Sequence, residues 1–438
     1  MEWPLALLLI FGCLMVLMAT GMPIAFAFLL TCTMGSILFW GGMVGIEQLA
    51  MSFYSSVTTF IFLPIPLFIL MGNIIFESGI GSTIIDDVDK TLGRLPGRLS
   101  ILAISAGTLI GAMSGISGGT IAMLARSLVP EMSKRGYKKA MTLGPIVICG
   151  TLDTLIPPSA LAVFLGAIGG IPIGQLLIAI IIPGLLLAGL CVSYIIVRCM
   201  LDPSLAPSYS VERVPFLKKV SVMSRCAVPV AAIIFAAIGV IFIGIATPSE
   251  AAALGAIGCF ILTAVYRKFN LPMVKRSAIG TIEITVMVFV IIVGSISFGR
   301  ILASSGALKG IVNLALSLPV HPIFIIIATQ LVIIFLGCFI DPGSIVMITV
   351  PMFMPIVSAL GYDKLWFGTI MVTNIQLGLI TPPFGLDCYT MKALAPPDVS
   401  LTDVFRSSMP FMTLGFFVIT LIMVFPQIAL WLPSLMGK

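Results

Sequence analysis

Long apolar segments and short polar segments alternate along the whole chain. The apolar segments, for example 4–20, 229–245 and 411–425, are rich in Leu, Ile, Met, Gly and Phe and show no two-residue alternation of apolar and polar positions. A helix needs about 20 apolar residues to cross the hydrocarbon core of a bilayer, whereas the strands of a membrane β-barrel need alternation. The pattern therefore predicts an all-α polytopic membrane protein embedded in the lipid bilayer.

The composition agrees with a membrane location. Hydrophobic residues make up 59% of the 438 residues and charged residues only 9%, and the mean hydropathy is +1.21. A soluble domain carries about a quarter charged residues. The first apolar segment lacks a basic start and a small-residue cleavage site, so we interpret it as a retained helix rather than a signal peptide. The net charge of +6 does not indicate nucleic-acid binding, because membrane topology explains the basic residues.

The apolar segments form two similar series separated by polar loops. The first series comprises helices at 4–20, 23–42 and 61–78, a surface segment at 43–60, two short pieces at 100–113 and 117–132, a span at 140–169 broken near Pro157, and a helix at 172–200. The second comprises 229–245, 248–266, 286–303, a two-part piece at 323–357, a broken span at 365–394 and a helix at 409–432.

A shift of 225 residues places prolines of the first series on prolines of the second. Thirteen prolines lie early enough to have a partner and six of them find one, whereas chance would give about one. Prolines interrupt helices, so shared positions indicate shared architecture. We predict two repeats, 1–213 and 214–438, as in many secondary transporters. The matched pairs are Pro4 with Pro229, Pro23 with Pro248, Pro130 with Pro355, Pro157 with Pro382, Pro158 with Pro383 and Pro172 with Pro397.

The basic residues predict the orientation of these segments. The loops at 79–99, 133–139, 198–225, 267–277 and 392–408 together hold 18 Lys and Arg, while the opposite side holds four. By the positive-inside rule the first group faces the cytoplasm. This holds only if 100–132 enters and leaves on the cytoplasmic side as a re-entrant hairpin. Each repeat then crosses five times, the second repeat is inverted with its hairpin 323–357 entering from outside, and both termini lie outside.

Four places in the sequence combine glycine, proline and polar residues inside apolar segments. Two are hairpin tips, at 114–119 and 337–344, and two are broken spans, at 150–159 and 374–383. Non-helical backbone is tolerated in a membrane only where protein or water satisfies it. Freed carbonyls and helix C-termini suit a hard cation, and helix N-termini suit an anion. One break would be a packing kink, but four in symmetric pairs predict an ion and substrate site.

Acidic residues inside membrane segments are candidate ligands. Asp153 lies in the first break and Asp341 at the second tip, and each could either bind a cation or cap the local backbone. Glu250 follows Thr247 with the spacing of a capping box, so we interpret it as structural. Arg126 lies near the cytoplasmic end of its hairpin and is expected to extend toward the membrane interface.

The residues needed for several other chemistries are missing. The chain has one histidine, His321, so the HExxH motif of zinc proteases is impossible. Its nine cysteines are scattered without a CxxC pair, and no GxxxxGK[ST] phosphate-binding loop is present. We therefore expect a protein that is not an enzyme and does not hydrolyse ATP by that route.

Several motifs carry a resemblance to a known family. They are Ser-Gly-Ile-Ser-Gly-Gly at 114–119, Leu-Ile-Pro-Pro-Ser at 155–159, Ala-Thr-Pro-Ser-Glu-Ala-Ala-Ala at 246–253, Asp-Pro at 341–342, Gly-Tyr-Asp at 361–363 and Thr-Pro-Pro-Phe-Gly at 381–385. In order and spacing the whole chain resembles the large membrane subunit of tripartite ATP-independent periplasmic (TRAP) transporters, which belong to the ion-transporter superfamily. The resemblance implies scaffold and transport domains and sodium-driven import of small organic acids across a bacterial inner membrane. It also implies a periplasmic binding protein and a small four-helix membrane subunit as partners.

The resemblance places about two sodium sites where hairpin tips meet broken helices. One would use Ser114, Gly115, Ser117, Gly150 and Asp153, and the other Asp341, Asn374, Gly378 and Thr381. The substrate is expected at Ser117, Thr151, Pro157, Asp341, Gln376 and Pro382. The sequence departs from the family pattern twice: Asp153 stands where glycine is usual, and Gln376 stands where an acid is common. Either departure could alter ion stoichiometry or substrate contacts.

Three alternatives remain open at this point. A symporter or antiporter of the same superfamily that works alone would share the repeats and hairpins without needing a binding protein. The permease of an ATP-driven importer predicts a cytoplasmic coupling helix for an ATPase and does not predict paired re-entrant hairpins. A membrane enzyme would gather its catalytic groups near one membrane face, whereas the unusual elements of this chain come in symmetric pairs. The particular organic acid, whether a sialic acid, a dicarboxylate, a sulfonate or another carboxylate, cannot be read from the residues.

Overall fold

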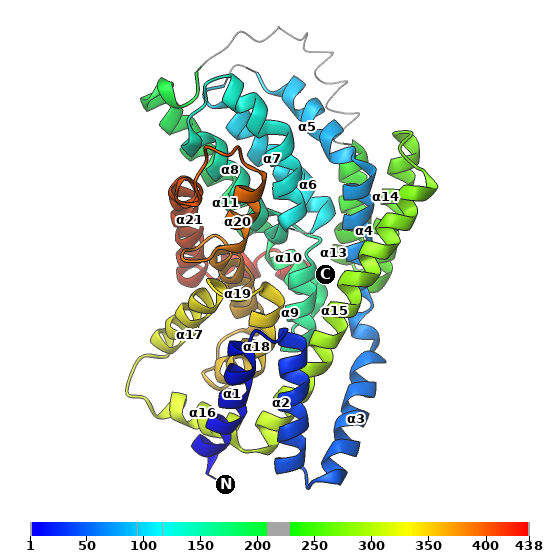
Figure 1. Ribbon diagram of the computed structural model, residues 1–438, viewed down its shortest axis with the longest axis vertical. Coiled ribbons are helices and arrows are strands. Elements are labelled where there is room, and N and C mark those ends of the chain that lie inside the picture. The colour runs from blue at the N-terminus through cyan, green and yellow to red at the C-terminus, as the bar shows by residue number, and fades with distance from the viewer. Residues whose placement is uncertain (1, 94, 116, 208–227, 437–438) are drawn as a thin grey trace.

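The structure is a computed structural model that describes residues 2–93, 95–115, 117–207 and 228–436. The described residues form helices and no strand, which confirms the all-α class (Figure 1). The predicted repeat boundary at 213/214 and the basic pair Lys218-Lys219 lie outside the described residues.

The described residues of the first half form eleven α-helices, and the described part of the second half begins with an apolar helical segment, Val228–Phe242. The helices of the first half are α1 (Trp3–Ala19), α2 (Ile24–Phe39), α3 (Met43–Val57), α4 (Pro64–Ser78), α5 (Ile80–Thr91), α6 (Arg98–Ser114), α7 (Ser117–Lys134), α8 (Lys139–Leu155), α9 (Ala160–Gly169), α10 (Ile173–Ala179) and α11 (Ile181–Leu201). Those of the second half are α13 (Val240–Phe242), α14 (Pro248–Val265), α15 (Leu271–Ser304), α16 (Ala307–Ser317), α17 (Pro322–Gly337), α18 (Pro342–Ala359), α19 (Lys364–Gly378), α20 (Leu386–Leu394), α21 (Leu401–Val424) and α22 (Gln427–Leu430).

Both predicted hairpins and both predicted breaks are present as helix pairs. The pieces at 100–113 and 117–132 form α6 and α7, and 323–357 forms α17 and α18. The span at 140–169 is bent by 44° between α8 and α9. Six helices in the described ranges are long and apolar enough to cross a membrane, or seven when that bent pair counts as one span. The chain is a multi-pass membrane protein, and the ten crossings with inverted repeats stay a prediction.

Two segments expected to be non-helical contain helices, and two helices begin earlier than expected. The surface segment at 43–60 is mostly helix α3, and the polar loop at 79–99 contains the amphipathic helix α5. The helix expected at 286–303 begins at Leu271, and the one expected at 409–432 begins at Leu401.

Capping explains the two early starts, which hydropathy alone does not detect. The side chain of Asn270 accepts a hydrogen bond from the backbone N–H of Met273 at 2.8 Å. Ser400 and Asp403 form a complete capping box at the start of α21. Such caps satisfy the first free N–H groups of a helix, so both helices extend into polar sequence.

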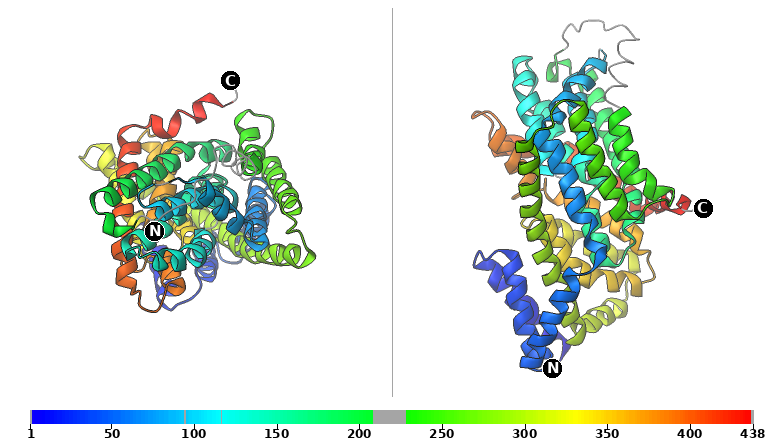
Figure 2. Two further views of the ribbon diagram at one scale, coloured as in Figure 1. Left: turned by 90° about the horizontal axis from the view of Figure 1, so that it is seen from above. Right: turned by 90° about the vertical axis from the view of Figure 1, so that its right-hand side faces the viewer.

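Two groups of helices are visible in the arrangement. Helices α4, α14 and α15 run side by side along the long axis of the molecule (Figures 1 and 2). Helices α2 and α3 pack against α15 on the same side. The pair α6–α7 lies in the upper half of Figure 1 and the pair α17–α18 in the lower half. The two predicted hairpins therefore occupy opposite halves of the molecule.

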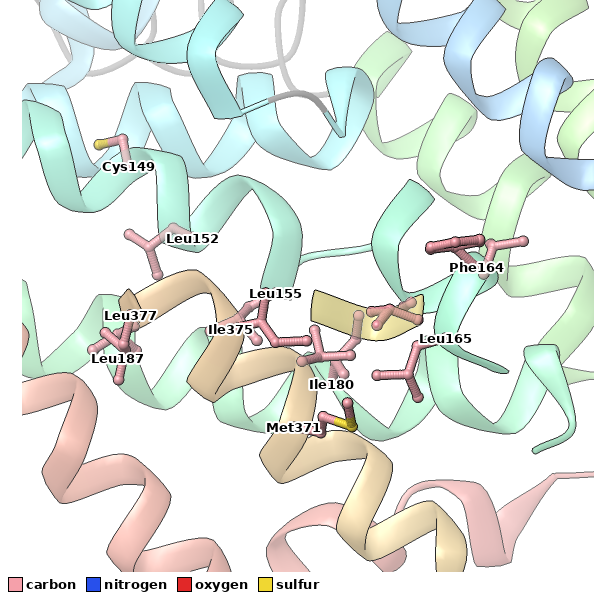
Figure 3. Packing of buried hydrophobic residues seen from close by; sticks show 14 of the residues in the cluster. Cys149, Leu152, Leu155, Phe164, Leu165, Ile180, Leu187, Met371, Ile375 and Leu377 are labelled. Carbon is pink, nitrogen blue, oxygen red and sulfur yellow. The ribbon is translucent and has the colours of Figure 1, made fainter. Parts of the chain in front are cut away.

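The broken helices α8 and α19 cross near the centre of the molecule. Figure 3 shows Leu155 at the end of α8 beside Ile375 of α19, and the two helices are in contact. Both side chains are fully buried. Burial of apolar surface holds the two breaks, one from each half of the chain, next to each other.

Candidate substrate and cation site

A cavity of about 580 Å³ lies where the two hairpin tips approach the broken helices. Gly115 and Ser117 of the first tip and the segment Asp341–Ser344 of the second tip line it. Thr154 and Ala160 of the first break and Gln376 of the second also contribute. The opposite wall is apolar and comes from α2, α4 and α15, with Ile65, Ile69, Met287 and Ile291 among its residues. The cavity thus brings together all four irregular elements that the sequence singled out.

Glycine residues allow the first hairpin tip to pack closely against the first break and against α4. Helix α6 ends at Ser114, and Gly115 follows with φ +60°, a conformation that favours glycine. A Cβ on Gly115 would lie 2.8 Å from the carbonyl oxygen of Pro158, so the tip packs directly on the first break. On the other side, a Cβ on Gly72 of α4 would lie 2.1 Å from the carbonyl oxygen of Ser114.

Asp153 is fully buried in the last turn of α8 and faces the first hairpin. Its carboxylate accepts hydrogen bonds from the hydroxyl of Ser114 at 3.1 Å and from that of Thr120 at 2.7 Å. A Cβ on Gly111 of α6 would lie 2.6 Å from the Cα of Asp153, so only glycine allows this approach. The sequence left open whether Asp153 binds a cation or caps backbone, and in the structure the hydroxyls of two side chains of the first hairpin donate to it.

Asp341 is the N-terminal cap of α18 at the second tip. Its carboxylate accepts a hydrogen bond from the backbone N–H of Ser344 at 3.1 Å and another from the Ser344 hydroxyl. Asp341 also lines the large cavity. The capping role that the sequence proposed as one alternative is therefore present, and the same carboxylate borders the space where a ligand would lie.

The second break meets the second hairpin through two glycines. A Cβ on Gly378 would lie 2.7 Å from the Cα of Gly337, so the ends of α19 and α17 are in backbone contact. Asn374 donates through its Nδ2 to the backbone carbonyl of Gln330 and to the Gln330 Oε1, each at 2.8 Å. Its own Oδ1 is buried and has no hydrogen-bond partner among the described residues. Thr381 donates to the carbonyl of Leu377 at 2.7 Å.

Residues 11–428 match the family described as tripartite ATP-independent periplasmic transporter, DctM component. The chain belongs to the DctM family. Within it, the chain is 29% identical to the C4-dicarboxylate TRAP transporter large permease protein DctM of Pseudomonas aeruginosa, over 90% of each chain.

Other members of the DctM family carry different substrate names. The chain is 28% identical to the sialic acid TRAP transporter large permease protein SiaM of Vibrio cholerae, covering 97% of this chain and 98% of that one. It is 29% identical to the ectoine TRAP transporter large permease protein TeaC of Halomonas elongata, covering 96% and 97%. The solved structure of the Alcanivorax borkumensis YdaH transporter has the same fold, with a TM-score of 0.64 at 16% identity over 90% of this chain and 91% of that chain.

The predicted site residues occupy different places in this DctM-family fold. Gly115, Ser117, Asp341 and Gln376 line the large cavity. Ser114 lines a smaller cavity of about 130 Å³ between α4, α6 and α7. The remaining predicted residues do not line the large cavity; Gly150, Thr151, Asp153, Pro157, Asn374 and Gly378 are buried, while Thr381 and Pro382 are partly exposed.

Sequence reasoning missed Asp387, the second residue of α20. Its side chain is buried, and a Cβ on Gly150 would lie 2.6 Å from its Oδ2. The signal was available, because Asp387 is an acidic residue inside the apolar span 365–394. Its nearness to α8 could not be read from the sequence, since Asp387 and Gly150 come from different halves of the chain.

Proposed function

We propose that this TRAP large permease is the transporting subunit of a sodium-coupled importer of small organic acids. The observation that carries the proposal is the cavity at which both hairpin tips and both helix breaks converge. Its volume of about 580 Å³ suits a small molecule, and such sites at the midplane are where secondary transporters bind cargo. The related permeases named for C4-dicarboxylates, sialic acid and ectoine support this substrate class.

The chemistry of the cavity supports binding of a polar or anionic group against an apolar wall. The first turn of α7 begins at Ser117 and that of α18 at Pro342, and both helix starts border the cavity. Free backbone N–H groups at helix starts attract anions. The Oε1 of Gln376 is buried without a hydrogen-bond partner among the described residues, so it is available to a donor on the substrate.

Oxygen ligands near the tips support a sodium requirement. Hydroxyl and carboxylate oxygens gather at Ser114, Thr120 and Asp153 in the first half, and hard cations prefer such ligands. In the second half, the buried Oδ1 of Asn374 has no partner among the described residues. We therefore propose one sodium ion beside the first hairpin tip and one beside the second broken helix.

We further propose an elevator motion of one group of helices against another. The transport body consists of the hairpins and broken helices, namely α6–α9 and α17–α20, and the scaffold consists of α2–α4, α14 and α15. Polar backbone at the tips would lose its partners if the elements of the transport body separated in lipid. Rigid-body movement keeps the contacts of Gly115 with Pro158 and of Gly337 with Gly378 intact.

The proposed partners are a small four-helix membrane subunit and a periplasmic binding protein, in a bacterial inner membrane. Large exposed apolar side chains on α3, such as Met51 and Tyr54, and on α15, such as Ile282 and Val286, leave the scaffold with an apolar outer face. Such a face suits lipid or another membrane helix.

Reconstitution tests the proposed function. The chain is placed in proteoliposomes with its small membrane subunit, and uptake of labelled succinate, N-acetylneuraminate or ectoine is measured with the binding protein outside. We expect uptake of one probe class that needs an inward sodium gradient and no ATP. Uptake that proceeds equally without sodium would contradict the coupling. Full uptake by this chain alone would replace the tripartite system with a stand-alone symporter of the same superfamily.

A further inference from the structure

Two buried carboxylates from opposite halves of the chain meet beside the first hairpin. Asp153 is 0% exposed and Asp387 is 4% exposed. Gly150 lies one helical turn before Asp153 on α8, and a Cβ on Gly150 would lie 2.6 Å from Oδ2 of Asp387. Residues three apart share a face of a helix, so Asp387 packs on the α8 face that carries Asp153.

The environment of these carboxylates is rich in hydroxyl groups. Asp153 accepts hydrogen bonds from Ser114 at 3.1 Å and from Thr120 at 2.7 Å, and these two hydroxyls lie 3.1 Å apart. The side chain of Ser117, at the start of α7, interacts with Asp387. Both Ser114 and Thr120 line the cavity of about 130 Å³ between α4, α6 and α7, which offers an approach to the hydroxyl cluster.

Asp387 retains unused bonding capacity. Its Oδ2 is buried and has no hydrogen-bond partner among the described residues. No ion pair within those same residues involves Asp387. This buried oxygen points at the helix that carries a second carboxylate. Burying such a charge is costly unless a bound cation or a proton neutralises it.

We propose that Asp387 and Asp153 together hold one cation, with the hydroxyls of Ser114, Thr120 and Ser117 around it. This inference rests on the proposed sodium coupling and adds to it a carboxylate from α20 that the family resemblance does not assign. With glycine at position 153, as the family pattern usually has, the site would keep one carboxylate. Here it has two, so it binds a hard cation more tightly and joins α20 of the second half to α7 and α8 of the first.

The test is direct binding of ²²Na⁺ to the purified permease, with no substrate present. Asp387→Asn preserves the shape of the side chain and removes its charge, and we expect sodium affinity at one site to fall at least tenfold. Asp398→Asn is the matched control, since Asp398 is an exposed carboxylate with a side-chain exposure of 75%. The Asp398→Asn variant should bind sodium with the same affinity and stoichiometry as the wild type.

A second variant keeps the test valid if Asp387→Asn fails to fold. Gly150→Ala leaves both carboxylates in the chain but places a methyl group only 2.6 Å from Oδ2 of Asp387, so the carboxylate must shift and the same binding step should weaken. In a double-mutant cycle, Asp153→Asn and Asp387→Asn should be strongly non-additive, because either change disrupts one shared site.

The outcomes separate the inference from the proposed function. If the wild type binds sodium and Asp387→Asn binds it with unchanged affinity and stoichiometry, the inference is overturned while sodium coupling stands. If the wild type binds no sodium at all, the proposed sodium coupling fails together with the inference.

Discussion

At the scale of single residues, glycines determine how closely the site can assemble. Gly111, Gly150, Gly337 and Gly378 all lie where a Cβ would come within 2.7 Å of another residue of the site. These positions are not turns, and they lie within or at the ends of helices, so the reason for glycine is close approach rather than backbone conformation.

The contact of Gly337 with Gly378 yields the first prediction. Gly378→Ala should push the ends of α17 and α19 apart and destabilise the permease by about 1–3 kcal/mol, as overpacking in a close-packed core does. The melting temperature of the purified protein should drop by several degrees, measured by intrinsic fluorescence. Gly189→Ala on α11 is the control, because nothing lies within 4 Å of the added Cβ there. Equal melting temperatures for both variants would contradict the close packing.

The second prediction concerns the hydroxyl of Ser117, which borders the cavity. Ser117→Ala should raise the sodium concentration needed for half-maximal uptake by about threefold to tenfold, since one oxygen ligand is lost. Ser193→Ala is the control, because the exposed Ser193 hydroxyl donates only to the carbonyl of Gly189 in its own helix. Sodium titration of uptake in proteoliposomes distinguishes the two. An unchanged titration for Ser117→Ala would remove it from the cation site.

At the scale of elements, polar contacts tie the scaffold helices together. Ser52 of α3 and Ser297 of α15 lie 2.9 Å apart, and Arg300 donates to Ser52 at 2.7 Å. Asn73 of α4 donates to Thr281 of α15 at 3.1 Å, and Arg276 pairs with Glu77 at 2.6 Å. Fewer such links are expected between scaffold and transport body if one slides against the other.

The third prediction tests that sliding. On a background without the nine native cysteines, Gly299→Cys with Pro351→Cys joins α15 to α18, where the two Cβ positions are 3.3 Å apart. Oxidation should stop transport and reduction should restore it. Ala237→Cys with Gly255→Cys, at 3.1 Å between Cβ positions, joins α14 of the scaffold to the neighbouring segment Val228–Phe242, which is not part of the transport body, and should leave transport intact when oxidised. Full transport with α15 and α18 crosslinked would contradict the elevator.

At the scale of the whole molecule, the distribution of basic residues predicts the orientation in the membrane. The five loops assigned to the cytoplasm hold 18 Lys and Arg against four on the other side. Lys138 and Lys139 are part of this group, and in the structure they contact Ser204, Asp398 and Asp403, from the loops at 198–225 and 392–408. Three loops predicted to share one side of the membrane thus lie together in the fold.

The fourth prediction follows from that orientation. Cysteines introduced beside Lys138 and Lys218 should resist an impermeant maleimide in intact cells, whereas one beside Lys364 should react. Permeabilised cells provide the control, since all three positions should then label. Reaction of all three in intact cells would show that the inverted arrangement is wrong.

The sequence by itself determined the fold class, the helix pairs and the elements that build the site. Hydropathy, shared proline positions and basic residues are patterns along the chain. They identify α6–α7, α17–α18 and the two breaks without a structure. Asp153 and Asp341 were found in the same way, as rare acids inside apolar segments. Helix starts at Leu271 and Leu401 were missed, because caps extend helices beyond their apolar parts.

Only the tertiary structure decided which of these groups meet. Asp153 accepts hydrogen bonds from the hydroxyls of Ser114 and Thr120 because α6 and α8 approach each other closely at Gly111. Asp387 lies against Gly150 because α20 packs on α8, although the two residues are more than 200 positions apart in the sequence. Such contacts depend on helix packing across the two halves, and no local pattern in the sequence encodes the distance between them.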